Sequence, residues 1–162
     1  MSDAAVTSTY RAARDSLLAL RGRPEDAVGS FHWPDLGHRF NWAVDWFDAV
    51  ARGNDGLALV VVEEDGTSES VSFDAMAARS DRVAKWLAEQ GIRRGDPVII
   101  MLNNQVELWD VMLAVMKLGA VIMPTTTAAG PADLTDRITR GGALHVVANA
   151  ADAPTFDSVP GT

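Results

Sequence analysis

An almost wholly apolar helix between two apolar strands constrains the fold of this chain more than any other feature. Residues 98–102 show no alternation of polar and apolar side chains, which is typical of a parallel strand buried on both faces. Residues 105–118 follow with apolar side chains almost all round, so we expect this helix to lie between two layers. Asn104 and Glu107 resemble a capping box at its start. Residues 120–123 then form the next strand, and the pattern predicts a parallel sheet covered by helices.

Predicted strands and helices also alternate upstream and downstream of this region. Their order predicts an α/β fold class, with a mostly parallel sheet, flanking helices and a β-hairpin. Upstream, residues 57–62 and 70–73 flank an acidic turn and predict the hairpin. Ser72 is placed to cap the next helix, in which apolar residues recur at three- and four-residue steps. Downstream, Pro131 begins a further helix, and residues 144–147 predict a third parallel strand.

Three segments differ in composition. Residues 1–54 predict a helical and aromatic-rich N-terminal extension, residues 55–148 an α/β core segment, and residues 149–162, rich in Ala, Asp and Pro, a flexible tail. Aromatic residues in the extension either anchor it to the body of a larger protein or form a ligand-binding box. We favour the anchor, because aromatic side chains bury large apolar areas. Six of the eleven aromatic residues lie in the part of the extension between Pro24 and Asn54: Phe31, Trp33, Phe40, Trp42, Trp46 and Phe47.

Charge and composition exclude several classes of protein. The net charge of −8 over 162 residues argues against nucleic acid and anionic membranes as partners. No apolar run approaches the roughly 20 residues that a membrane helix needs, and the N-terminus lacks the apolar stretch of a secretory signal. Without cysteine, the chain has no disulfides, thiolate nucleophiles or zinc–thiolate sites. We therefore expect a cytoplasmic protein.

Motifs that carry chemistry by themselves are absent from the sequence. It has no Walker loop, no Gly-x-Gly-x-x-Gly and no Gly-x-Ser-x-Gly. His32, His38 and His145 lack the spacing of metal ligands, and His145, within an apolar strand, is expected to be a core residue. The acidic run 63–65 is expected to be a solvated turn rather than a metal site. We predict no catalytic residue and no metal ligand.

Several blocks nevertheless resemble a known family in their order and spacing. Residues 71–87 form a short strand, an aromatic residue and a helix, and residues 107–124 form a helix ending Lys-Leu-Gly-Ala and a strand ending in proline. Residues 91–96 resemble the linker between these blocks, and residues 40–45 the entry segment. Together they are similar to the N-terminal part of adenylate-forming (AMP-binding) enzymes of the acyl-CoA synthetase family, in its medium-chain acyl-CoA synthetase-like branch.

The resemblance implies an activity that this chain does not carry alone. The family uses ATP, Mg²⁺ and CoA to convert a carboxylic acid into acyl-CoA through an acyl-adenylate. The family's Ser/Thr/Gly-rich phosphate loop and its C-terminal lysine have no counterpart here, so we expect an N-terminal fragment that is inactive by itself and binds none of these cofactors tightly. Its expected partners are the remainder of the synthetase and the acid, with self-association possible through incompletely covered apolar surface. The alternative is a non-catalytic α/β binding or interaction module that kept the fold.

Residues 124–130 are the segment most suited to face a ligand. They follow the carboxyl end of a predicted parallel strand, where open α/β sheets bind ligands, and their side chains are small with several hydroxyl groups. Thr125 and Thr126 are expected on a substrate-facing loop. The resemblance implies that Thr127 and Ala128 approach the CoA channel. The alternative is that the threonines only lead into and cap the helix that begins near Pro131.

Overall fold

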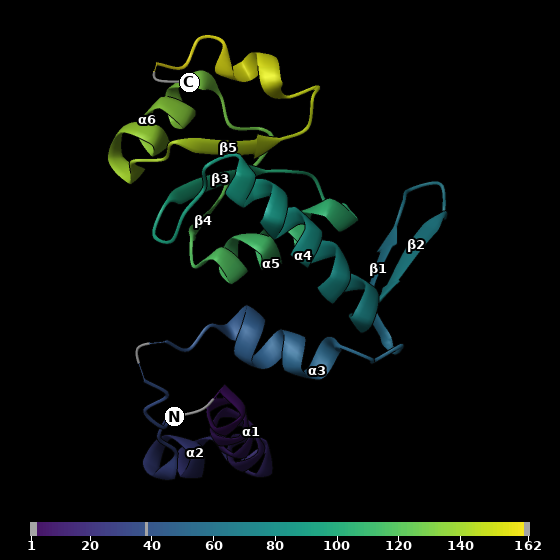
Figure 1. Cartoon of the computed structure of the whole chain (residues 1–162), viewed down its shortest axis with the longest axis vertical. Coiled ribbons are helices and arrows are strands. Elements are labelled where there is room, and N and C mark those ends of the chain that lie inside the picture. The colour runs from purple at the N-terminus through teal and green to yellow at the C-terminus, as the bar shows by residue number, and fades with distance from the viewer. Residues whose placement is uncertain (1–2, 38, 161–162) are drawn as a thin grey trace. The chain divides into compact units, whose positions relative to one another are not determined.

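A computed structural model of the chain describes residues 3–37 and 39–160 (Figure 1). His38, one of the three histidines that lack the spacing of metal ligands, lies outside the described residues. The chain divides into two compact units, Met1–Val50 and Ala51–Thr162, each of which is described by itself.

Helices make up the first unit, and a mixture of helices and strands the second. The first unit contains α1 (Asp3–Ala19), α2 (Pro24–Ser30) and the π-helix η1 (Trp42–Asp48), and α3 (Ala49–Ala51) lies at the boundary. The second contains β1 (Leu57–Val62), β2 (Ser68–Ser72), α4 (Phe73–Glu89), β3 (Pro97–Met101), α5 (Val106–Leu118), β4 (Val121–Pro124), α6 (Pro131–Gly141), β5 (His145–Ala148) and the 3₁₀ helix η2 (Ala153–Phe156).

Aromatic side chains hold the first unit together around Tyr10 of α1. The centre of its ring lies 5.6 Å from that of Trp33, 5.2 Å from that of Phe40 and 5.0 Å from that of Trp46. The Arg14 guanidinium lies 4.9 Å from the Trp46 ring, a cation–π distance. Aromatic residues of the extension therefore contact one another, and their role as an anchor or as a ligand-binding box stays a prediction.

Three parallel strands form the sheet of the second unit, in the order β4-β3-β5. Val98 of the central strand is in register with Ile122 of β4 and His145 of β5, and Ile100 with Pro124 and Val147. The predicted parallel sheet is confirmed. His145 lies half-buried, with its Nε2 atom 4.0 Å from a carboxylate oxygen of Asp96.

Alternate side chains of β3 serve two separate cores. Val98 and Ile100 pack with residues of α4 and α5, and Ile99 and Met101 pack with residues of α6 and the C-terminal segment. Both faces of the central strand are therefore buried, which explains its lack of polar alternation. The first cluster also contains Ala84, Leu87, Ile92, Val111, Ala114 and Val115; the second also contains Ala129, Leu134, Ala143, Phe156 and Val159.

The apolar helix α5 packs against the strands β3 and β4 and against α4, with which it shares the cluster around Val98 and Ile100. Gly119 ends it in the left-handed conformation, with φ at 69°. The predicted capping box is wrong: Gln105 is the N-cap residue, and its side chain makes no capping hydrogen bond. Its amide Nε2 instead donates to Oε2 of Glu107 at 3.1 Å.

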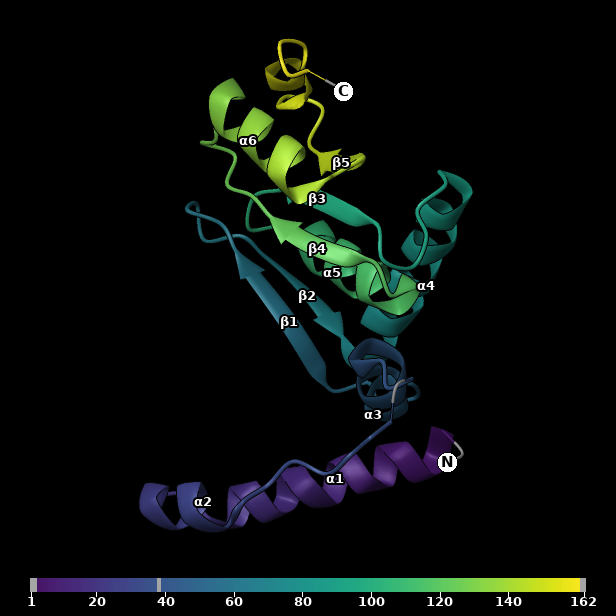
Figure 2. The same ribbon diagram turned by 90° about the vertical axis from the view of Figure 1, so that its left-hand side faces the viewer.

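The β-hairpin is confirmed and forms a sheet of its own (Figure 2). Ser72 caps α4 as predicted, because its Oγ accepts a hydrogen bond from the Ala75 amide at 3.2 Å. In β1, Val61 is buried, whereas Val60 and Val62 are 42% and 64% exposed. The hairpin therefore leaves an apolar face open in the described part of the chain.

Residues 149–160 pack on the second core. The structure forms the short helix η2 there and buries Phe156 and Val159 against Ile99 and Met101. The segment expected to be a flexible tail thus contributes two side chains to the core. Its flexibility in solution stays a prediction.

Candidate functional site

Two loops leave the carboxyl edge of the sheet toward opposite faces. Residues 102–105 lead from β3 into α5, which covers the face of Val98 and Ile100. Residues 125–130 lead from the neighbouring strand β4 into α6, which covers the other face. Adjacent strands whose connections diverge in this way form a topological switch point, the place where open α/β sheets bind ligands. The geometry supports residues 125–130 as a ligand-facing loop.

The four residues predicted for this loop differ in their surroundings. Thr125 is buried: its amide donates to the carbonyl of Ile100 at 2.9 Å and its hydroxyl to that of Met123 at 3.2 Å. Thr126 and Ala128 are exposed, and Thr127 is half-buried. Thr125 therefore extends the pairing of β4 with β3, and the structure brings Thr126, Thr127 and Ala128, but not Thr125, to the surface.

Hydrogen bonds within the loop hold its backbone in a tight turn. The Thr126 hydroxyl accepts from the Ala128 amide at 3.2 Å, and the Thr126 carbonyl accepts from the Ala129 amide at 3.0 Å. Ala129 is buried in the second core. The threonines do not cap α6: its N-cap is Gly130, which makes no side-chain hydrogen bond.

Asn103, which the sequence reasoning did not assign to the site, contacts this loop. The Thr127 hydroxyl donates to Oδ1 of Asn103 at 3.1 Å and so joins the loops that follow β3 and β4. The sequence did contain a signal for this contact: Asn103 is a polar residue directly after an apolar strand. The carboxyl ends of neighbouring parallel strands meet at one edge of the sheet, so the residues that follow them lie close together.

Charged side chains form a partly buried seam of ion pairs between α4 and α5, in which Asp110 and Lys117 are the buried members. Asp110, only 3% exposed, accepts from Arg79 through one carboxylate oxygen, at 2.8 Å from Nε and 2.7 Å from a terminal nitrogen. The other oxygen, Oδ1, has no hydrogen-bond partner among the described residues. The hydrogen bond with Asp110 raises the pKa of Arg79, against the opposing effect of burial.

A second ion pair closes the other end of the seam. Nζ of Lys117 lies 2.6 Å from a carboxylate oxygen of Asp81 and donates to the Ala77 carbonyl at 3.2 Å. Burial acts to raise the pKa of Asp81, but hydrogen bonds from Lys117 and Arg52 outweigh it and leave the pKa below its ordinary value. Lys117 is thus a structural residue.

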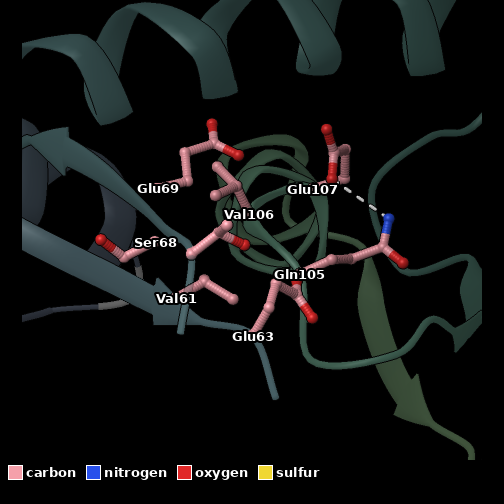
Figure 3. Close-up of a pocket in the computed structure, with 8 residues that line it drawn as sticks. Val61, Glu63, Ser68, Glu69, Gln105, Val106 and Glu107 are labelled. Carbon is pink, nitrogen blue, oxygen red and sulfur yellow. Dashed lines mark hydrogen bonds between the residues drawn. The ribbon is translucent and has the colours of Figure 1, made fainter. Parts of the chain in front are cut away.

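A separate hollow of about 260 Å³ lies between the hairpin and the start of α5 (Figure 3). Val61 and Val106 contribute apolar side chains to it, and Glu63, Glu69 and Glu107 contribute carboxylates. Three negative charges repel phosphate groups, so this hollow is unsuited to ATP or CoA.

The described residues contain no group of three or more His, Cys, Asp or Glu residues that could hold a metal ion. Asp65, in the acidic turn, accepts from the hydroxyl and the amide of Thr67 at 2.7 and 2.9 Å, and these bonds lower its pKa. Within the same residues, no helix combines the length and hydropathy needed to cross a bilayer.

Comparison with known proteins identifies the class to which this fold and site belong. The family model described as AMP-binding enzyme matches residues 46–161, which include the whole parallel sheet and both loops at the switch point. The chain belongs to the AMP-binding enzyme family. The resemblance to the N-terminal part of acyl-CoA synthetases, inferred from the sequence blocks, is confirmed.

Particular relatives are acyl-CoA ligases. The chain is 26% identical over 127 residues to 4-hydroxybutyrate–CoA ligase 1 of Metallosphaera sedula, covering 76% of this chain and 22% of that protein. It is 29% identical over 127 residues to the human mitochondrial acyl-coenzyme A synthetase ACSM3, covering 74% and 22%. The crystal structure of Brucella canis acyl-CoA synthetase superimposes with a TM-score of 0.72 at 28% identity, covering 91% of this chain and 27% of that one. The chain thus spans about a fifth of the length of these two curated relatives.

Proposed function

We propose that this chain is the N-terminal part of an ATP-dependent acyl-CoA synthetase of the medium-chain type. The whole enzyme would convert a carboxylic acid, ATP and CoA into acyl-CoA, AMP and pyrophosphate. The observation that carries the proposal is the family match over residues 46–161, which contains the complete switch point of the sheet. Relatives that are acyl-CoA ligases support the thiol CoA as acceptor of the acyl group.

In this proposal the chain contributes one wall of a substrate passage. Thr126 and Ala128 present small side chains at the surface, and Thr127 is fixed beside them, which suits a wall that a long, flexible substrate passes closely. CoA is the substrate we assign to Thr127 and Ala128. We assign Thr126 to the part of the loop that faces the carboxylic acid substrate. Thr125, which is buried, supports the backbone of the loop.

ATP and Mg²⁺ would be held by other parts of the enzyme. The described residues offer no set of metal ligands, and the hollow beside the hairpin carries three carboxylates. We therefore assign the nucleotide and its metal to other parts of the enzyme, and we assign the described residues no chemical step. The synthetase would be cytoplasmic, in keeping with the absence of cysteine from the chain.

Acid-dependent ATP–pyrophosphate exchange tests the proposal. The isolated 162-residue chain is expected to give no exchange above background with a panel of straight-chain and aromatic acids. The gene is then read beyond the codon for Thr162, and the product of the whole reading frame is expected to show exchange that EDTA abolishes.

Two results would contradict the proposal. Exchange by the isolated chain would show that it carries its own nucleotide site. A whole gene product that folds but neither exchanges pyrophosphate nor forms acyl-CoA with any acid would favour the non-catalytic module.

A further inference from the structure

Asn103 contacts Thr127 at the switch point and has no role in the proposed function so far. Thr127 follows β4, Asn103 follows β3, and the residues are 24 positions apart. Among the described residues, their hydrogen bond of 3.1 Å is the one that joins side chains of the two diverging loops. It therefore ties the loops together at the place where the sheet opens.

The loop after β4 is held at both of its ends, but its exposed turn between them has fewer contacts. Thr125 is fixed to Ile100 and Met123, and Ala129 is buried in the second core. Between them, Thr126 and Ala128 are exposed, and their described hydrogen bonds stay within the turn: the Ala128 amide donates to the Thr126 hydroxyl and the Ala129 amide to the Thr126 carbonyl. Thr127 alone of these three reaches across to the neighbouring loop, so its position depends on Asn103.

We propose that Asn103 is a positioning residue that holds Thr127, and with it the exposed turn 126–128, in the conformation that CoA meets. This inference rests on the proposed function, because it assigns CoA to the loop. Asn103 acts through Thr127 and contacts no reacting atom. A loop that is already held in its binding conformation loses less conformational entropy when CoA binds. The hydrogen bond between Asn103 and Thr127 therefore affects the affinity for CoA rather than the turnover of bound substrate.

Variants of the whole synthetase test the pair through kinetics. N103A and T127V each remove the hydrogen bond, and we expect each to raise the KM for CoA about three- to tenfold, as loss of one hydrogen bond allows. The kcat and the KM for ATP should stay within about twofold. T127S keeps the hydroxyl and should restore most of the affinity. The double variant should be no worse than either single one, because both remove the same bond.

Asn104 supplies the matched control. It is the exposed neighbour of Asn103 on the same loop, and its side chain makes no hydrogen bond among the described residues. N104A should leave the KM for CoA unchanged. The inference is overturned if N103A or T127V stays within twofold of wild type, if T127S is as impaired as T127V, or if the effects of the two substitutions add.

A readout on the isolated chain separates this inference from the proposed function. The Ala128 amide donates to the Thr126 hydroxyl and reports on the turn. In NMR spectra of the 162-residue chain, N103A and T127V should shift its resonance and speed its hydrogen exchange, whereas N104A should not. If the whole gene product is inactive, the proposed function fails and this measurement alone decides whether Asn103 holds the turn; an unchanged Ala128 signal would overturn the inference.

Discussion

Replacement of Arg79 by methionine should destabilise the chain more than its partly exposed position suggests. Arg79 makes the described hydrogen bond and ion pair to Oδ2 of Asp110, and Oδ1 of Asp110 has no hydrogen-bond partner among the described residues. R79M would therefore leave the Asp110 carboxylate without a partner at a position where the residue is only 3% exposed.

The magnitude follows from the burial of the two partners. Removing one member of a buried ion pair costs about 3–5 kcal/mol, because the other charge stays desolvated. The Arg79 side chain is 31% exposed, so water reaches part of the vacated space and we expect about 2–4 kcal/mol. That is a large share of the roughly 5–15 kcal/mol that stabilises a typical domain.

Urea unfolding followed by circular dichroism at pH 7 measures the effect, with D110L and the double variant as companions. D110L should cost about 1 kcal/mol, because the freed guanidinium turns to water and lies 3.8 Å from Glu107. R79M/D110L should return to within about 1 kcal/mol of wild type, as buried pairs replaced by apolar residues often do. An R79M cost below about 1 kcal/mol, or a double variant as unstable as the sum of the single ones, would refute the reasoning.

Three further predictions concern other parts of the second unit. The pKa of Asp81 is lowered, so its contribution to stability is complete above its unfolded pKa of about 4 and is lost as the pH falls through the lower folded value. The stability difference between wild type and K117M, measured by urea unfolding, should therefore be present at about pH 6 and shrink below about pH 4. A difference that stays constant with pH would contradict this role of Asp81. F156A should cost about 2–4 kcal/mol in the same assay if residues 149–160 pack as described, whereas a cost below about 1 kcal/mol would support the flexible tail. V60K/V62K, at the exposed face of β1, should shift light-scattering masses toward the 17.3 kDa monomer if the chain self-associates there; an unchanged mass distribution would exclude this face.

Local patterns in the sequence determined which segments become strands and helices. The strand at 97–101 was recognisable because both of its faces are buried, and that requirement leaves an unbroken apolar run. Ser72 was recognisable as a helix cap because capping depends on a side chain and an amide three residues away. Gly119 marked the end of α5 because a left-handed residue is needed there.

Other local signals failed where neighbours competed for the same side chain. Asn104 and Glu107 had the spacing of a capping box, yet Gln105 is the N-cap and its amide bonds to Glu107. Thr125 and Thr126 looked alike in the sequence. Register with β3 buries the first, and the turn exposes the second.

Only the tertiary structure decided which distant residues meet. The pairing of β3 with both β4 and β5, the contact of Asn103 with Thr127 and the ion pair of Arg79 with Asp110 each join residues more than 20 positions apart. Periodicity reports the environment of a residue but not the identity of its partner, because many arrangements of the same helices and strands bury the same faces. The strand order and the packing of α4 on α5 select one of them, and the switch point and the seam of ion pairs exist only as a result of that selection.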